Sequence, residues 1–185
     1  YYKDKGLNDY GIAGLMGNLY AKSGLKPTNL QNTYEKKLGY TDAEYTAAVD
    51  QGIYTNFVKD SAGYGLAQWT YHTRKKAMYE FIKYKNESIG NLEAQLEFLY
   101  KELSTGYSSV LSSLKNANSV LEGSNAVLLK YERPADQSVS AQNKRASFGQ
   151  KYFDKYSEKG SGATMGVKTY QENNKVKLSD NFNSY

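Results

Sequence analysis

The sequence contains no cysteine and a single histidine, His72, in 185 residues. The absence of cysteine excludes disulfide bonds, thiol catalysis and cysteine-based zinc sites. A lone histidine argues against a Ser-His-Asp triad and against a metal site built from several histidines, so we expect no metal and no cofactor. Apolar runs are also short, and none approaches the roughly 18 residues that a membrane-spanning helix needs. We therefore expect no membrane partner.

Charge of one sign is not concentrated anywhere along the chain. The net charge is +5, but Lys and Arg alternate with Asp and Glu, and no long basic block appears. A specific nucleic-acid binder usually gathers its positive charge on one face, so we expect no nucleic-acid partner. A modest positive charge does suit approach to an anionic cell wall. With 39% apolar residues, the chain is long enough to bury one sizeable core.

Apolar residues recur with the helical period over most of the chain. A first helix is expected at 11–23, where Asn8 or Asp9 can cap the start and Gly24 can follow the end. A capping-box pattern at Thr41 predicts a short second helix. Residues 60–70 predict a turn that leads into an extended or tightly bent segment. Further helices are expected at 73–85, 91–103, 107–114, from 119 to Pro134, and at 140–156.

The periodic pattern stops at Glu158, where small residues without periodicity are typical of a flexible linker. We expect residues 1–158 to form one domain and residues 159–185 to be a linker with the start of a further module, or alternatively a disordered tail. The chain also opens at Tyr1 without an initiator Met or a leader, so we expect it to be part of a longer protein.

Two stretches carry a resemblance to a known family. The first reads Gly-Asn-Leu-Tyr-Ala-Lys-Ser-Gly from Gly17 to Gly24, and the second reads Gly-Tyr-Gly-Leu-Ala-Gln-Trp-Thr from Gly63 to Thr70. They resemble the two motifs of the phage tail lysozyme family. Weaker matches follow in order at 95–103, 131–134 and 145–146, so that the resemblance covers about residues 3 to 157. It implies a lysozyme-like fold of the α+β class, predominantly α-helical with a small β element.

The same resemblance implies a function. It implies a muramidase-type glycosidase that cleaves the β-1,4 glycan backbone of bacterial peptidoglycan, acting outside the cell or from a virion. The glycan strands of peptidoglycan would then be the partner, with no cofactor. Residues 175–185 faintly resemble the opening of zinc D,D-carboxypeptidase-type domains. We therefore expect 159–185 to lead into a peptidase-like module of a larger multi-domain hydrolase or phage tail.

One position departs from the family pattern. The resemblance implies a catalytic Glu within Ala-Glu-Ser-Gly, and this chain has Lys22 there. An ammonium group is a poor acid at a glycosidic oxygen. We expect either a variant inactivated by substitution, which we favour, or a natural chain that has lost its acid. Without the flanking motif, Lys22 would be interpreted as a lysine that extends its charged end to solvent past the helix end.

Helical geometry also makes position 22 informative. Around the helix axis, Leu15 lies about 20° from it, Asn18 about 40° and Leu19 about 60°. Gly11 shares this face and is expected to leave a gap in the surface. A carboxylic acid on such a largely apolar face would lose hydration, and its pKa would rise toward about 6, as a general acid at neutral pH requires. Position 22 is therefore expected at the wall of a cleft.

Glycan cleavage needs a second group, either a nucleophile about 5 Å from the acid or a base about 6.5–9.5 Å away. Asp60 is the first candidate, because it shortly precedes the glycine-rich turn at 63–65 that is expected to approach the cleft. Asp42, Asp50 and Glu35 are weaker candidates. The alternative for Asp60 is that its carboxylate bonds the backbone amides of the turn.

Five residues are candidate glycan contacts. Gln68 offers an amide to N-acetyl or hydroxyl groups. Trp69 offers a ring to a pyranose, although it can equally anchor the core. Tyr64 lies between two glycines, is expected to be exposed and is the better stacking candidate. The full set consists of the amide beside position 22 and four residues of the second motif: Asn18, Tyr64, Gln68, Trp69 and Thr70.

These observations leave three functions to separate. The first is a peptidoglycan glycosidase domain of muramidase type whose acid is missing in this chain. The second is a natural pseudoenzyme that binds the cell wall without cutting it. The third, a nucleic-acid binder, is supported only by the mild positive charge. A Glu placed at position 22 separates the first two, and a mobility shift on DNA tests the third.

Overall fold

The computed structural model describes residues 1–157 of the chain, and most of them lie in helices. The predominantly α-helical character that was expected is therefore confirmed. Residues 159–185, expected to hold a linker and a further module, lie outside the described residues. The helices are, in chain order, α1 (Asp9–Ser23), α2 (Asn32–Leu38), α3 (Asp42–Asp50), α4 (His72–Tyr84), α5 (Leu92–Gly106), α6 (Ser108–Asn116), α7 (Val120–Ala126), the π-helix η1 (Val127–Glu132) and α8 (Val139–Tyr156).

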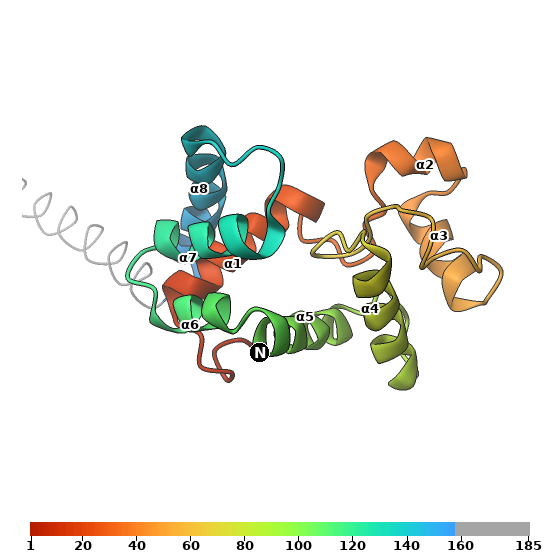
Figure 1. The fold of residues 1–185 in the computed structure, drawn as a ribbon, viewed down its shortest axis with the longest axis horizontal. Coiled ribbons are helices and arrows are strands. Elements are labelled where there is room, and N and C mark those ends of the chain that lie inside the picture. The colour runs from red at the N-terminus through yellow and green to blue at the C-terminus, as the bar shows by residue number, and fades with distance from the viewer. Residues whose placement is uncertain (158–185) are drawn as a thin grey trace, which may run out of the picture.

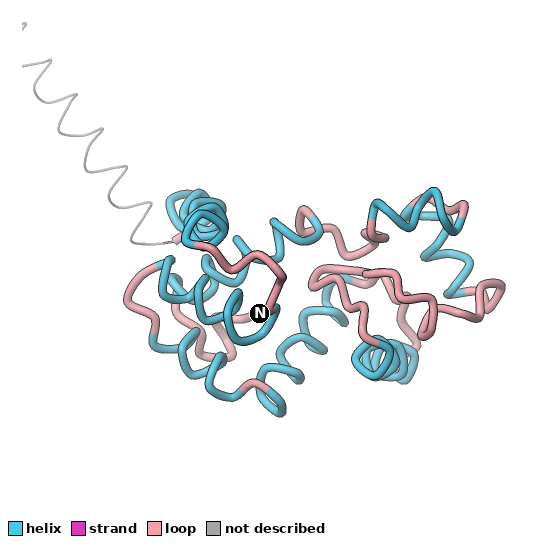
Figure 2. Tube along the Cα trace, turned by 45° about the horizontal axis from the view of Figure 1, so that its top comes forward, coloured by secondary structure: helices cyan, strands magenta, loops and turns pink. Residues whose placement is uncertain are grey.

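The helices form two groups that α5 connects (Figure 1). On one side α1 packs against α6, α7 and α8, and on the other side lie α2, α3 and α4. α5 runs lengthwise along both groups and contacts α4 and α6. Figure 2 shows the same division, with loop segments lying between the groups. The C-terminal end of α1 points toward this middle region (Figure 1).

α1 has the caps that the sequence predicts. The side chain of Asn8 accepts a hydrogen bond from Gly11 N at 2.9 Å, and Gly24 ends the helix with a φ of 63°. The gap expected at Gly11 is absent, because a Cβ there would lie 1.9 Å from Leu114 O. At Gly17 a Cβ would lie 2.4 Å from Arg145 O. The glycines of α1 therefore serve close packing against α6 and α8, not an open surface.

The other expected helices are confirmed with small shifts at their ends. Thr41 and Glu44 form the capping box at the start of α3. Only α2 was not predicted: it has seven residues, no side-chain cap and no buried residue, so it lacks the apolar spacing that reveals a helix in sequence. The segment ending before Pro134 is confirmed as helical, but its last six residues form η1, which the α-helical period does not predict.

The small β element expected from the sequence is not present as a strand in the part of the chain that the structure describes. Two isolated bridges, Leu30 with Tyr64 and Tyr64 with Trp69, stand in its place. Tyr64 and Trp69 exchange both backbone hydrogen bonds, at 3.2 and 3.0 Å, around a turn of four residues. The expected bent segment is therefore a very short hairpin. It is too short to pair further because its chain turns again at both ends.

One hydrophobic core joins the two groups of helices. It takes buried side chains from every long helix except α8 and from the hairpin, for example Leu15, Tyr45, Tyr64, Met78, Leu99 and Leu114. A smaller cluster of Ala13, Val120 and Phe153 holds α8 against α1 and α7. Across residues 1–157, none of the helices combines the length and apolar character that crossing a membrane requires.

Candidate functional site

Position 22 lies in the last turn of α1, and Lys22 is half-buried there. The next residue ties this helix end to the hairpin, because Ser23 Oγ lies 3.0 Å from Leu19 O and 2.9 Å from Leu66 O. Lys22 makes no hydrogen bond or ion pair within the described residues that the structure records. Its ammonium is nevertheless close enough to lower the pKa of Glu132. The charge of Lys22, in the last turn of α1, therefore acts on a buried carboxyl group at the end of η1.

Glu132 is the acidic residue beside position 22. It is the last residue of η1, and its side chain is 2% exposed. Burial raises its pKa, while Arg145, Lys22 and Arg74 act in the opposite direction without reversing the shift. One carboxylate oxygen accepts a hydrogen bond from Arg145, but Oε1 accepts none from residues 1–157. The site therefore contains a buried carboxyl group with a raised pKa and an unused acceptor atom.

Arg145 holds this carboxyl group in place from α8. Its Nη1 contacts both Glu132 and Asn18 Oδ1, the latter at 3.1 Å. Asn18 is itself fully buried, and its Nδ2 lies 2.9 Å from Gly14 O and 3.0 Å from Ser124 O. The expectation that Asn18 contacts glycan is therefore corrected. Its amide links α1 to α7 and orients Arg145, because a buried amide must satisfy its polar atoms within the protein.

Sequence reasoning missed Glu132 and Arg145 as site residues. Both fall in stretches that continue the family resemblance, 131–134 and 145–146, but an acidic residue before a proline is by itself typical of a helix end. The proline does follow a terminated helix, since Arg133 adopts a left-handed conformation with a φ of 45°. What the sequence did not show is that η1 turns the Glu132 side chain inward. The signal for a shared site is that the two stretches that contain Glu132 and Arg145 both match the family pattern.

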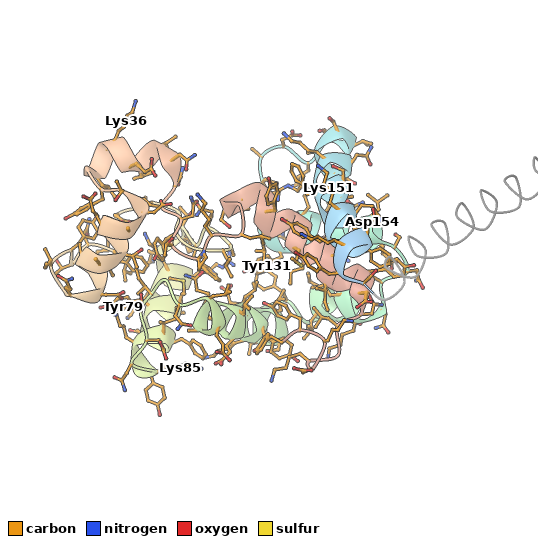
Figure 3. All side chains as sticks on the ribbon, turned by 180° about the vertical axis from the view of Figure 1, so that it is seen from behind. Lys36, Tyr79, Lys85, Tyr131, Lys151 and Asp154 are labelled. Atoms are coloured by element: carbon orange, nitrogen blue, oxygen red, sulfur yellow. The ribbon has the colours of Figure 1, made fainter. Side chains whose placement is uncertain are left out.

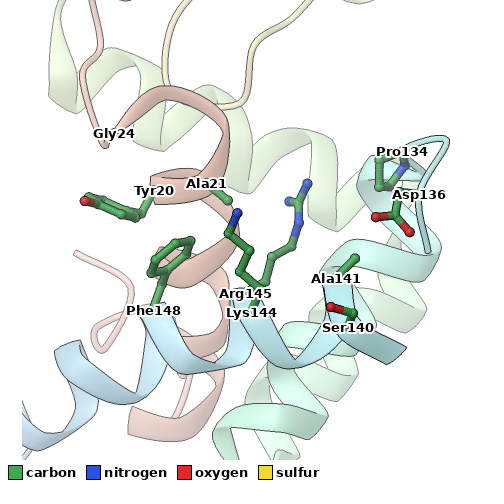
Figure 4. A pocket seen from close by; sticks show the side chains of 10 residues that line it. All are labelled: Tyr20, Ala21, Gly24, Pro134, Asp136, Ser140, Ala141, Lys144, Arg145 and Phe148. Atoms are coloured by element: carbon green, nitrogen blue, oxygen red, sulfur yellow. The ribbon is translucent and has the colours of Figure 1, made fainter. Parts of the chain in front are cut away.

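A groove of about 630 Å³ opens beside this site. One wall comes from the end of α1 and the other from α8, with the 134–136 loop at one end. Figure 4 shows Lys144 and Arg145 extending from α8 toward the end of α1, and the ring of Tyr20 lies beside that of Phe148 in an edge-to-face arrangement. The residues that line the groove include Tyr20, Ala21, Asp136, Lys144, Arg145 and Phe148. The groove is thus open, mixed in polarity and bordered by residue 21, next to position 22.

The second motif is bound into the core through a network around Glu102. Trp69 Nε1 donates to Glu102 Oε2 at 2.8 Å, and Arg74 binds both oxygens of Glu102 at 2.8 and 2.9 Å. Tyr131 OH donates to the same carboxylate at 2.7 Å. Figure 3 shows Tyr131 near the middle of the molecule. Because Tyr131 precedes Glu132, this network connects the second motif to the position-22 site.

Two of the expected glycan-stacking rings are buried. Trp69 is 0% exposed, which confirms the alternative that it anchors the core. Tyr64 was expected to be exposed, and this is wrong: it is also 0% exposed, and its hydroxyl lies 2.6 Å from Thr46 Oγ1. The rings point inward because the hairpin is covered on both sides by α3 and α5, whose buried residues complete the core. Neither ring has a face available to a sugar.

Gln68 and Thr70 lie at the outer end of the hairpin. Gln68 adopts a φ of 52°, and its Nε2 donates to Asn29 O at 2.9 Å and reaches Gly65 O at 3.1 Å. Its amide therefore holds the hairpin to the 26–30 loop. Thr70 is exposed, and its hydroxyl bonds Gln68 O at 2.9 Å. Of the four motif residues expected to contact glycan, Thr70 alone presents an exposed side chain.

Asp60 belongs to a buried ion pair. Its carboxylate is 1% exposed, accepts from Lys75 Nζ at 2.5 Å and from Ala62 N at 3.0 Å, and is bonded by the hydroxyls of Tyr45 and Tyr54. Burial lowers the pKa of Lys75, and Asp60 opposes this shift. These contacts favour the alternative that Asp60 holds the turn, because no face of the carboxylate is open to substrate.

Metal binding has no visible basis in the described part of the chain. Within residues 1–157, no group of three or more His, Asp or Glu side chains gathers closely enough to hold a metal ion. The polar groups of the site are instead a lysine, an arginine, a buried carboxyl group and an amide. Such a set can bind and orient a polar polymer and tune the pKa of a neighbouring acid.

Comparison with known proteins shows the family to which the sequence belongs. The family model described as phage tail lysozyme matches residues 1–156, which is nearly the whole described chain. No curated protein matches the sequence. The match covers both motifs, the Glu102 helix, Glu132 and Arg145. It indicates a lysozyme-like peptidoglycan hydrolase that acts at the cell wall or as part of a virion.

Proposed function

The chain belongs to the phage tail lysozyme family, and we propose that it binds the glycan strands of bacterial peptidoglycan without cutting them. The form with Glu at position 22 would be a muramidase that cleaves the β-1,4 bond after N-acetylmuramic acid. Residues 1–158 would be the glycan-cutting domain, and residues 159–185 the linker to a peptidase-like module in a larger hydrolase or phage tail.

The observation that carries this proposal is the supported, buried Glu132 on whose pKa the charge at position 22 acts. Lys22 stands where the resemblance implies the catalytic acid, and its charge reaches a carboxyl group that is 2% exposed. The surrounding elements are intact: Asn18 and Arg145 hold Glu132, and an open groove borders residue 21. A site that retains its support and lacks only its acid is expected to keep binding substrate.

A Glu at position 22 would acquire the properties of a general acid from this environment. Two carboxyl groups that share one site cannot both ionise easily, so the pKa of one of them rises. Glu132 is too buried to touch a glycan, and we assign it as a positioning residue that raises the pKa of the acid at position 22. Arg145 lowers the pKa of Glu132 against the effect of its burial, so that Glu132 and the half-buried carboxyl at position 22 can share one proton.

The test compares the unmodified chain with Lys22→Glu and Lys22→Gln on purified sacculi. All three are expected to sediment with the sacculi. Only Lys22→Glu is expected to release soluble glycan fragments, because a general acid typically contributes about 10²–10⁴-fold to the rate. Lys22→Gln is the matched control, since it has the shape of Glu without its proton. Fragments are measured by mass spectrometry and by loss of turbidity.

Three outcomes would change the proposal. Rapid clearing of sacculi by the unmodified chain would show that another residue supplies the proton. A folded Lys22→Glu variant that binds sacculi and releases no fragments would favour the natural pseudoenzyme. An unmodified chain that does not bind sacculi at all would overturn the proposed substrate.

A further inference from the structure

A row of aromatic rings extends from the groove along the side of α8 that adjoins α1. We call Tyr20, Phe148, Tyr152 and Tyr156 the aromatic strip. The rings of Tyr20 and Phe148 are 4.9 Å apart, those of Tyr20 and Tyr152 6.1 Å, and those of Tyr152 and Tyr156 6.4 Å. Tyr20 is 42% and Tyr156 61% exposed. Together the four rings form one continuous aromatic surface, on which Tyr20 and Tyr156 are exposed to solvent.

The aromatic strip is continuous with the groove beside position 22. A second cavity of about 200 Å³ lies along the strip, and it shares Tyr20 and Phe148 with the larger groove. In Figure 4 these two rings stand at one side of the groove. A polymer lying in the groove would therefore pass onto the strip without leaving the protein surface.

Lysines accompany the rings. Lys144, Lys151 and Lys155 are all exposed, and the spacing of the helix places them beside Phe148, Tyr152 and Tyr156. Figure 3 shows Lys151 on α8, on the same group of helices as the groove. None of the three forms a recorded ion pair with another residue in 1–157, and Lys155 Nζ lies 5.1 Å from the centre of the Tyr156 ring. Within residues 1–157, the surface thus combines aromatic rings with positive charges that form no recorded ion pair.

We propose that the aromatic strip is a second glycan-binding surface, which holds the peptidoglycan strand beyond the position-22 site. This inference rests on the proposed function. The apolar face of a pyranose can pack on the exposed rings, and the lysines can pair with the free carboxylates of the stem peptides. Rings with a polar tip suit an occupant that is apolar on one face and polar at its edge. A neutral protein partner would leave the three lysines without partners.

The experiment measures dissociation constants on purified sacculi and on the same material after an amidase has removed the stem peptides. Tyr156→Ala is expected to weaken binding to both materials by about two- to tenfold, as the loss of one ring contact predicts. Lys151→Glu with Lys155→Glu is expected to weaken binding to intact sacculi more strongly. That charge effect is expected to become weaker on stripped glycan, which keeps only the lactyl carboxylates that the amidase frees, and to shrink at high salt.

Matched controls make the same chemical changes on the other group of helices. Tyr84 at the end of α4 is 90% exposed, and Lys36 on α2 is exposed and lies far from α8 in Figure 3. Tyr84→Ala and the double change of Lys36→Glu with Lys37→Glu, which is also exposed, are expected to bind as the unmodified chain does. Thermal unfolding of each variant checks that the fold is unchanged, and exposed positions of this kind usually tolerate substitution.

Each remaining outcome overturns the inference. If the strip variants bind sacculi as well as the controls do, the aromatic strip is not a glycan-binding surface. Release of fragments by Lys22→Glu would in that case still support the proposed function. Failure of the unmodified chain to bind sacculi removes both. If sedimentation shows that the chain self-associates and that Tyr156→Ala abolishes this association without weakening wall binding, the strip is a contact between two copies.

Discussion

At the scale of single residues, the ionisation of Glu132 is decided by its neighbours. Burial raises its pKa, and the charges of Arg145, Lys22 and Arg74 lower it, leaving a net increase. A carboxyl group with a raised pKa binds protons more tightly in the folded state. Its contribution to stability is therefore fully present below the unfolded pKa and is lost as the pH rises through the folded pKa.

This balance predicts how substitutions at position 22 act at a distance. Lys22→Met removes a charge that lowers the pKa of Glu132, so that pKa is expected to rise, and Lys22→Glu is expected to raise it further. The loss of stability with rising pH should then extend to higher pH in both variants. A carbon-detected NMR titration of the Glu132 carboxyl measures the shift.

Lys26→Met is the control for this titration. Lys26 is exposed and follows α1 in sequence, and it is not among the charges that act on Glu132. Its removal is expected to leave the titration unchanged. Equal shifts of the Glu132 pKa in Lys22→Met and Lys26→Met would mean that Glu132 responds only to net charge. That result would contradict a specific effect of Lys22 on Glu132.

A second residue pair, Asp60 with Lys75, is expected to control stability. Lys75→Met would leave the buried Asp60 carboxylate without its cation, and such a loss typically costs about 3–5 kcal/mol. Lys75→Met with Asp60→Asn is expected to recover part of this loss. Urea unfolding measures both.

The adjacent Lys76 supplies the control for this pair. Its partner Glu80 is exposed and lies 3.6 Å away, so Lys76→Met is expected to change stability by no more than about 0.5 kcal/mol.

The same pair can be tested for a catalytic role in the Lys22→Glu background. An Asp60→Asn protein that is fully folded there but loses fragment release would support a catalytic Asp60.

At the scale of elements, the contact between α1 and α8 places Arg145 beside Glu132. Gly17 makes this contact possible, since a Cβ there would lie 2.4 Å from Arg145 O and 2.6 Å from Gly149 N. Backbone atoms cannot move aside as a flexible side chain can. The close contact at Gly17 therefore sets the position of α8 relative to α1, which carries position 22.

Gly17→Ala is accordingly expected to destabilise the protein by about 1–3 kcal/mol and to shift α8. Unfolding measurements give the first effect, and weaker binding to sacculi by the folded fraction reports the second. Gly106→Ala is the matched control, because a Cβ at this end of α5 meets nothing within 4 Å. Alanine there is expected to be neutral or slightly stabilising. Similar effects of the two substitutions would contradict the close-contact argument.

At the scale of the whole molecule, the network around Glu102 connects the two groups of helices. Trp69 and Arg74 come from the hairpin and α4, Glu102 from α5, and Tyr131 from η1. These residues lie in separate blocks of the sequence that resembled the family. Their meeting at one carboxylate explains why the blocks occur together: each supplies one part of a shared buried site.

The sequence by itself determined most of the helices with their caps and the family, and it indicated position 22 as a candidate site residue. Helical periodicity and capping depend on residues within one or two turns, so they can be recognised locally. Only the tertiary structure decided which polar and aromatic residues face solvent. Tyr64 is buried against α3, and Asp60 is buried between Tyr45 of α3 and Lys75 of α4, which no local pattern records.

The tertiary structure also decided which residues surround position 22. Arg145 reaches Asn18 from 127 positions along the chain, and η1 turns Glu132 inward beside them. A π-helical turn and a glycine contact between helices have no strong signature in local periodicity. The site depends on the π-helical turn and on the glycine contact. Segments that are distant in sequence pack around each site residue and set its burial and its electrostatic environment.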